Sequence, residues 1–89
     1  MRANQTRTLI ASANTWVAIT VPVGAQDILL GVESSSATFR ISVDNALNPS
    51  TEGLYVGSTG LYGHEGVTTA ELTIYISASL STFAILTYN

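Results

Sequence analysis

The sequence predicts an all-β fold, a single small antiparallel β-sandwich or barrel of six to seven strands. Apolar residues recur at every second position in several segments, and no segment shows the period of 3.6 residues that an amphipathic helix requires. Turn-forming residues separate these segments at short intervals. Short alternating strands separated by turns are typical of sandwiches and small barrels. With 89 residues, the chain is expected to form one such domain, over residues 13–89.

Residues 1–12 are expected to precede this domain as an N-terminal arm. Arg2 and Arg7 are the only charged side chains before Asp27, whereas the rest of the chain holds six acidic residues and one base. The segment is therefore basic and the body is acidic. Two interpretations are open. The segment is either an extended arm that a partner orders through Arg2 and Arg7, or a frayed end over residues 1–6.

Four segments alternate between apolar and polar side chains, the pattern of a strand with one buried face. In chain order, their inward positions are predicted to be Val17, Ile19, Val21 and Val23; Ile28, Leu30 and Val32; Phe39, Ile41 and Val43; and Leu72, Ile74, Ile76 and Ala78. Pro22 has no backbone N–H to donate, so the first of these strands is expected to end near it or to lie at a sheet edge.

Residues 82–89 are apolar on both sides of the expected strand. A strand of this kind is either central in its sheet or part of an interface. We expect Phe83 and Ile85 to face the core of the monomer. Leu86 and Tyr88 are then expected to project from the opposite face, where a lone sandwich has no second layer to cover them.

Turn chemistry separates the strands. Short connections are expected at residues 23–27, 34–37 and 79–81, and the last of these is expected to close a hairpin with the final strand. Two longer connections, residues 45–53 and 57–66, hold most of the glycines.

Charged side chains are scarce and none is lysine: they make up 10% of the residues, against about a quarter in a typical soluble domain. Because 46% of the residues are hydrophobic, the chain is expected to fold rather than to be disordered. A domain of this size buries a modest share of its surface, and without cysteine it has no disulfide to stabilise it. We therefore expect a homo-oligomer, with Tyr75, Leu86 and Tyr88 at the interface between copies.

The charge pattern and the length of the apolar runs disfavour two classes of partner, nucleic acid and membrane. An acidic body without lysine does not neutralise a row of phosphates, so nucleic acid is not expected to bind. No apolar run reaches the roughly 18 residues of a membrane span, and the first residues do not form a secretory signal. The protein is therefore expected to stay in the compartment where it is made.

Catalytic chemistry is not expected. His64 is the only histidine, and the sequence has no Gly-x-Ser-x-Gly elbow that would accompany a serine nucleophile. The glycine-rich run at residues 57–60 lacks the lysine and the following helix of a phosphate loop. We predict a protein that is not an enzyme and binds no cofactor.

One loop, residues 44–53, concentrates oxygen-bearing side chains and leaves two interpretations open. These side chains are Asp44, Asn45, Asn48, Ser50 and Glu52. Calcium prefers such oxygens, but the spacing of a known calcium loop is missing. The alternative is an ordinary turn in which the side chains bind the loop's own backbone.

The aromatic residues suggest contacts. Trp16 is expected to lie in the core at the entry to a strand. Tyr55 and Tyr62, with His64, are candidates for contact with a ligand or receptor, since aromatic rings in glycine-rich loops stack on sugars. Subunit contact is the alternative role for the tyrosines.

The strand spacing and the hydroxyl-rich composition resemble those of the small all-β virion proteins of tailed bacteriophages, which include head decoration (cement) proteins and fibre bases. The stretches that carry the likeness are residues 14–22, 39–44 and 84–89. The likeness is one of style over most of the chain and includes no diagnostic motif.

The resemblance implies a symmetric homo-oligomer, often a trimer, bound to the major capsid protein or another virion protein. Such a protein is assembled into the virion in the host cytoplasm and has no enzymatic activity. The leading hypothesis is thus a capsid decoration subunit. The alternative is a sugar- or receptor-binding module of a phage fibre.

Overall fold

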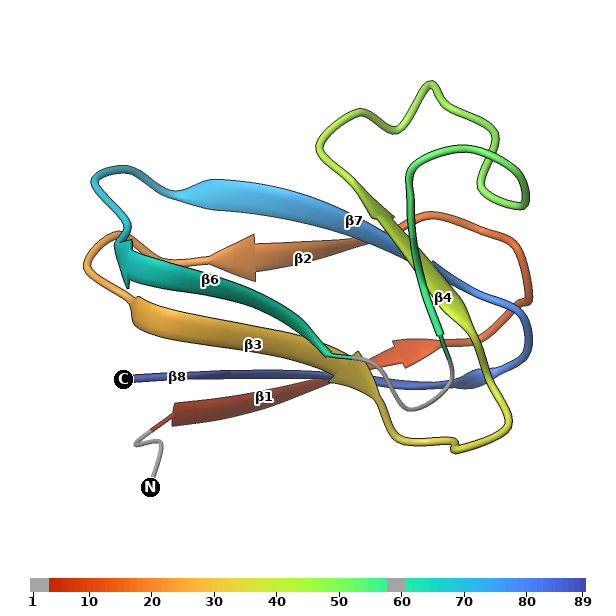
Figure 1. Ribbon diagram of the computed structural model, residues 1–89, viewed down its shortest axis with the longest axis horizontal. Helices are drawn as coiled ribbons and strands as arrows, with labels where there is room; N and C mark the ends of the chain where they lie inside the picture. Colours follow the sequence, from red (N-terminus) through yellow and green to blue (C-terminus); the bar gives the residue numbers. More distant parts are fainter. Residues whose placement is uncertain (1–3, 58–60) are drawn as a thin grey trace.

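The computed structural model describes residues 4–57 and 61–89 and shows an all-β fold (Figure 1). Within these residues the chain forms eight strands of three or more residues and no helix. The strands make two four-stranded antiparallel sheets that pack face to face, so the fold is a sandwich and not a closed barrel. The expectation of six to seven strands is therefore too low. Three strands were not expected from the alternation: Asn4–Ile10 in the segment assigned to the arm, Leu54–Val56 and Tyr62–Val67. The last of these lies in the connection expected over residues 57–66, so that expectation is wrong for residues 62–66.

Each sheet has one edge strand from the first part of the chain. Sheet A contains, in spatial order, β1 (Asn4–Ile10), β8 (Thr82–Tyr88), β3 (Gln26–Val32) and β6 (Tyr62–Val67). Sheet B contains, in spatial order, β2 (Val17–Val21), β7 (Leu72–Ala78), β4 (Phe39–Ser42) and β5 (Leu54–Val56).

The pairing of the strands is nested. The first strand pairs with the last, β2 with β7, β3 with β6, and β4 with β5, all antiparallel. The chain therefore has the pairing of one long hairpin folded back on itself, and two further pairs, β3 with β8 and β4 with β7, complete the sheets. This arrangement of eight strands in two sheets is that of a jelly roll.

Only the β4–β5 connection stays within one sheet; each of the other connections between successive strands passes from one sheet to the other. The hairpin expected at residues 79–81 is therefore wrong, because β7 and β8 lie in different sheets. Side-chain hydroxyls stabilise this crossing. The backbone N–H of Thr38 donates to Ser79 Oγ at 2.9 Å, and that of Ser34 donates to Thr82 Oγ1 at 3.1 Å.

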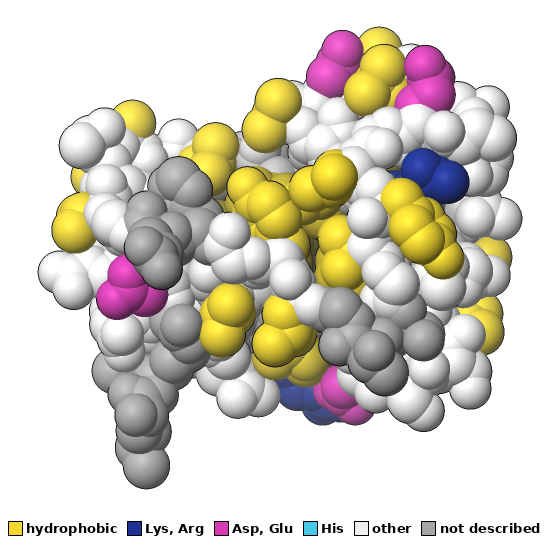
Figure 2. Space-filling view, in the orientation of Figure 1, with side chains coloured by type: hydrophobic (Ala, Val, Ile, Leu, Met, Phe, Trp, Pro, Cys, Tyr) yellow, Lys and Arg dark blue, Asp and Glu magenta, His cyan; other side chains and the backbone are white. Residues whose placement is uncertain are grey.

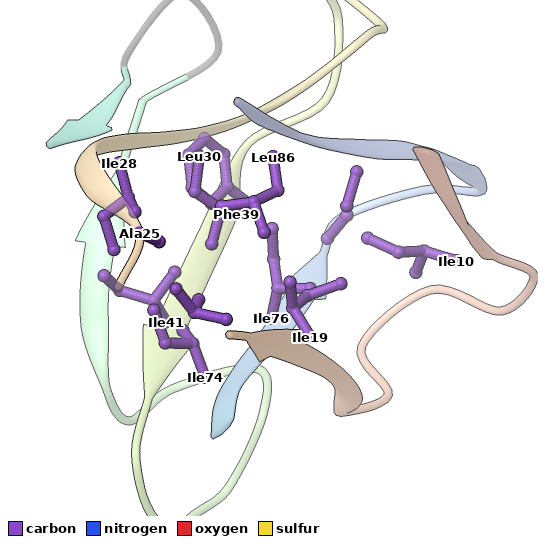
Figure 3. Close-up of a cluster of buried hydrophobic side chains, with 13 residues drawn as sticks. Ile10, Ile19, Ala25, Ile28, Leu30, Phe39, Ile41, Ile74, Ile76 and Leu86 are labelled. Carbon is purple, nitrogen blue, oxygen red and sulfur yellow. The ribbon is translucent and has the colours of Figure 1, made fainter. Parts of the chain in front are cut away.

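The core lies between the sheets and follows the alternation predicted for four strands (Figure 3). Its buried members are Ile10, Ile19, Val21, Ala25, Ile28, Leu30, Phe39, Ile41, Ile74, Ile76, Ala78, Ala84 and Leu86. Val23 and Val43 were expected inward but are 64% and 75% exposed. They lie beyond the ends of β2 and β4, and β2 ends just before Pro22, as expected.

The two faces of β8 are the reverse of those predicted. Leu86 is 2% exposed and belongs to the core, whereas Phe83 and Ile85 lie on the outer face of sheet A. Strand register explains the difference, because residues opposite each other on neighbouring strands share a face. Leu86 pairs with the inward-facing Leu30, and Phe83 pairs with the exposed Leu9.

Residues 4–10 belong to the domain and not to an arm. β1 pairs with β8 along its whole length, and Ile10 is fully buried. The ion pair between Arg7 and Glu33 further ties β1 to the connection after β3. Arg2, the other predicted arm contact, lies outside the described residues.

Candidate functional site

The outer face of sheet A carries apolar side chains that no second layer of the described residues covers. We define the apolar face of sheet A by Leu9, Leu29, Leu61, Phe83 and Ile85. Leu9 is 52% exposed and Leu61 is 64% exposed, so these are large hydrophobic groups in contact with water. Between them lies a hollow of about 270 Å³, lined by Leu29, Gly31, Val32, Leu61, Ile85 and Thr87.

The local sequence explains how this face forms. Phe83 and Ile85 alternate with the buried residues of β8, so they must point away from the core. Leu9 lies opposite Phe83 on β1, and Gly31 lies opposite Ile85 on β3. Because glycine has no side chain, the surface at Gly31 is recessed beside Ile85. The strand that the sequence shows as apolar on both sides thus supplies the core with one side and this face with the other.

A charged pair borders the apolar face. The guanidinium carbon of Arg7 lies 4.1 Å from the centre of the Phe83 ring, the geometry of a cation–π contact, and Arg7 Nε donates a hydrogen bond to Glu33. That hydrogen bond raises the pKa of Arg7 above its ordinary value. Arg7 therefore carries its charge at neutral pH, and Glu33 balances this charge locally.

The predicted interface residues do not share one surface. Leu86 is in the core, and Tyr88 is half-buried against it. Tyr75 lies on the outer face of sheet B, opposite Ala18 of β2 and Ser42 of β4. The residues that form the apolar face of sheet A were missed as interface residues. Their common face is set by the pairing of β8 with β1 and β3, which the sequence alone does not show.

A second feature, the Arg40 pocket, lies on the outer face of sheet B. It has a volume of about 100 Å³ and is lined by Asn14, Thr38, Phe39, Arg40, Pro49, Ser50, Tyr55, Ser77, Ala78 and Ser79. Most of these side chains are polar. The pocket therefore differs in chemistry from the face on sheet A.

The loop between β4 and β5 builds one wall of the Arg40 pocket. The indole N–H of Trp16 donates to the carbonyl of Leu47 at 2.8 Å, and Ser77 Oγ donates to the carbonyl of Pro49 at 2.9 Å. These bonds hold the loop against sheet B. Trp16 was expected in the core; it is half-buried and anchors this loop.

The oxygen-bearing side chains of this loop bind the loop itself. Asp44 Oδ1 accepts from the N–H of Ala46 at 2.9 Å, Asn48 Oδ1 from that of Ser50 at 3.0 Å, and Glu52 Oε1 from that of Asn48 at 2.7 Å. These contacts fit the turn interpretation of residues 44–53. In the part of the chain that the structure describes, no three His, Cys, Asp or Glu side chains group closely enough to hold a metal ion.

Arg40 is the cation of the pocket. Its guanidinium carbon lies 5.0 Å from the centre of the Tyr55 ring. Among the side chains that the structure describes, which do not include that of Glu65, no carboxylate lies within ion-pair distance of Arg40, in contrast to Arg7. A guanidinium held on an aromatic ring without a carboxylate partner presents its N–H donors to whatever enters the pocket.

The three candidate contact residues are divided between the sheets. Tyr55 is in β5 of sheet B and lines the Arg40 pocket. Tyr62 and His64 are in β6 of sheet A, and only the backbone of His64 is described, opposite Ile28. Tyr55 and Tyr62 line two different pockets.

Tyr62 instead lines an apolar hollow of about 200 Å³ where the two sheets meet at their open edges. Its other lining residues are Ile41, Ser42, Val43, Leu54, Leu72 and Ile74. Figure 2 shows hydrophobic side chains gathered around a hollow in the middle of the view, over the region of β4 and β6.

No family model, curated protein or solved structure matches the chain. In the described segments, no helix is long and apolar enough to cross a membrane. The apolar face of sheet A and the Arg40 pocket are the two candidate functional sites of the described residues.

Proposed function

We propose that the protein is a structural subunit without enzymatic activity that associates with copies of itself through the apolar face of sheet A and decorates a virus head. The observation that carries the proposal is the set of large hydrophobic side chains on that face, of which Leu9 and Leu61 are exposed and the other three half-buried, in a chain with few charges. Contiguous apolar surface of this kind marks interaction sites in soluble proteins.

The size of the molecule supports a second copy as the occupant of the face. A stable interface of standard size buries about 800 Å² on each partner. That is roughly one sixth of the 4901 Å² that this chain exposes, an area that one face of a two-layer sandwich supplies. Arg7 and Glu33 lie beside the apolar side chains, which is the usual position of charges at an interface rim.

The proposed attachment to a virus particle draws on two further features. Jelly rolls of eight strands are used by viral capsid subunits, although lectins and cupins share the fold and the fold alone does not assign a function. The chain has no lysine, and short Thr, Ser and Asn side chains lose little conformational entropy when a surface docks. These features suit a protein whose outer surface is covered in an assembly.

Binding to undecorated phage heads tests the particle role. Wild-type protein is expected to sediment with the heads and to raise the temperature at which they release DNA. The Leu9→Asp variant is expected to bind more weakly, because fewer copies cooperate at the surface. Heads that bind neither protein, with no change in release temperature, would rule out the decoration role and leave self-association to be judged separately.

A sugar- or receptor-binding module is the second candidate function, and the Arg40 pocket favours it. The pocket offers an aromatic ring and several hydroxyl groups on a rigid sheet, the materials of a carbohydrate site. A glycan array with wild-type protein and Tyr55→Ala tests it. Binding that disappears in the variant supports this candidate; an array on which no glycan binds rejects it.

A further inference from the structure

We infer that the Arg40 pocket binds the carboxylate of an acidic sugar, such as a uronic acid. The inference rests on the second candidate function and deepens it by naming the class of ligand. It does not depend on self-association, because the pocket and the apolar face of sheet A lie on the outer faces of opposite sheets.

The position of Arg40 gives it the geometry of an anion receptor. Arg40 lies on β4 between Ser77 of β7 and Tyr55 of β5, its partners in the two neighbouring strands. The Tyr55 ring lies against the guanidinium, 5.0 Å from its central carbon, and restricts its orientation. A planar guanidinium places two parallel N–H groups at the spacing of two carboxylate oxygens.

The charge pattern of the chain makes this arginine unusual. Arg40 is the only Lys or Arg after Arg7, in a stretch that holds all six acidic residues. None of the described carboxylates neutralises it. A half-buried arginine that makes no ion pair with a described carboxylate, in a chain rich in acids, is the arrangement expected when the anion comes from outside.

The walls of the pocket offer partners for sugar hydroxyls. Ser79 Oγ accepts a hydrogen bond from the N–H of Thr38, so its own hydrogen is free to point elsewhere. Ser77 Oγ donates to Pro49 and keeps lone pairs as acceptors. The N–H of Asn14 donates to the carbonyl of Ala78 at 2.8 Å and holds this residue, at a φ of 55°, beside the pocket.

These contacts favour a sugar acid over the other anions. The hydroxyl, amide and aromatic groups of the lining match a ring that bears both hydroxyls and a carboxylate. A phosphate would be met by a single arginine and no lysine, in an acidic chain. A volume of about 100 Å³ holds a carboxylate and the adjoining part of a ring, so one sugar unit is recognised.

An NMR titration of the whole chain tests the inference with three probes: glucuronate, glucose and N-acetyl-aspartate amide. Glucuronate is expected to shift the Arg40 Nε–H signal and the amides of Ser77 and Ser79. Glucose, which lacks the carboxylate, is expected to bind with an affinity lower than that of glucuronate by a factor of about ten or more. This is the loss that follows from removing one charge-assisted hydrogen-bond pair.

Three variants locate the site. Arg40→Gln is expected to lose glucuronate binding by about tenfold or more, and Arg40→Lys to keep only part of it, because lysine lacks the planar fork. Arg7→Gln removes the same charge from the other sheet and is expected to bind as the wild type does. A dispersed NMR spectrum verifies that each variant is folded.

Three results would overturn the inference. The first is equal binding of glucose and glucuronate, and the second is unchanged glucuronate binding by Arg40→Gln. The third is binding of N-acetyl-aspartate amide as tight as that of glucuronate, and this result would assign the pocket to a peptide carboxylate. Neutral glycans that bind on the array without glucuronate binding here would reject the acidic sugar and keep the second candidate function. The sedimentation mass of Arg40→Gln reports on self-association independently.

Discussion

Leu86 and Ile85 are neighbours in β8 with opposite surroundings. Leu86 is packed among side chains of both sheets (Figure 3), whereas Ile85 faces outward and lines the hollow of sheet A. Removing a buried leucine side chain loses its burial and leaves a cavity that the surroundings fill only in part. Shortening an outward side chain leaves no cavity in the monomer.

Leu86→Ala is therefore expected to lower the free energy of unfolding by about 2–5 kcal/mol, and Ile85→Ala by about 1 kcal/mol or less. Urea unfolding followed by circular dichroism, on protein dilute enough to be monomeric, gives both values. A larger loss for Ile85→Ala than for Leu86→Ala would contradict the assignment of the two faces.

Sequence alternation identifies buried residues only where one side of a strand is polar. Phe39 and Ile76 were predicted correctly for that reason. In β8 both sides are apolar, so the local pattern holds no information about the inward side. The choice is made by pairing with β1 and β3, which are distant in sequence. The sequence likewise did not indicate that Arg40 lines a pocket, because the walls of the pocket come from the loop between β4 and β5 and from β7, which is distant in sequence.

At the scale of elements, the loop between β4 and β5 is fixed by contacts to β7 and to the chain before β2. Gly53 lies at its end with a φ of 86°, and a Cβ atom there would lie 2.8 Å from the carbonyl oxygen of Ile41 and 3.1 Å from Trp16 Cη2. Gly24 has a similar φ of 84°, but a Cβ atom on it would meet nothing within 4 Å.

The two glycines form a matched pair for one prediction. Gly24→Ala is expected to cost about 1–2 kcal/mol of stability, the backbone cost of a Cβ in the left-handed region. Gly53→Ala is expected to cost more and to change the fluorescence of Trp16, because the added methyl group displaces the indole. Urea unfolding followed by tryptophan fluorescence measures both effects. Equal losses of stability in the two variants, with unchanged tryptophan emission, would show that the loop accommodates the added methyl group without displacing Trp16.

The turns were predicted from composition, and those at residues 23–27, 34–37, 45–53 and 79–81 lie close to the observed connections, whereas the connection expected at residues 57–66 contains most of β6. Whether a turn closes a hairpin or crosses between sheets was not predictable, since residues 79–81 suit either course. The outcome depends on which strands pair, and β7 pairs with β2 and β4 instead of with β8. The same limit explains the assignment of residues 4–10 to an arm: β1 has little alternation of its own and is held as a strand by β8.

At the scale of the whole molecule, an all-β sandwich followed from the period of two and from the turn residues. The jelly-roll order did not, because nested pairing joins residues as distant as Asn4 and Tyr88. The fold leaves one face of sheet A apolar and exposed, and a single 89-residue chain has no further layer to cover it. Self-association covers this face without any additional element.

Sedimentation equilibrium of three proteins tests this central claim most directly. Wild-type protein is expected to have a mass of two or more chains. Leu9→Asp places a charge on the apolar face and is expected to shift the equilibrium to folded monomer. Val43→Asp makes a similar change at a site that is 75% exposed and lies outside that face, and is expected to keep the wild-type mass. A wild-type protein that stays monomeric as its concentration rises, or a Leu9→Asp variant with the wild-type mass, would contradict the claim.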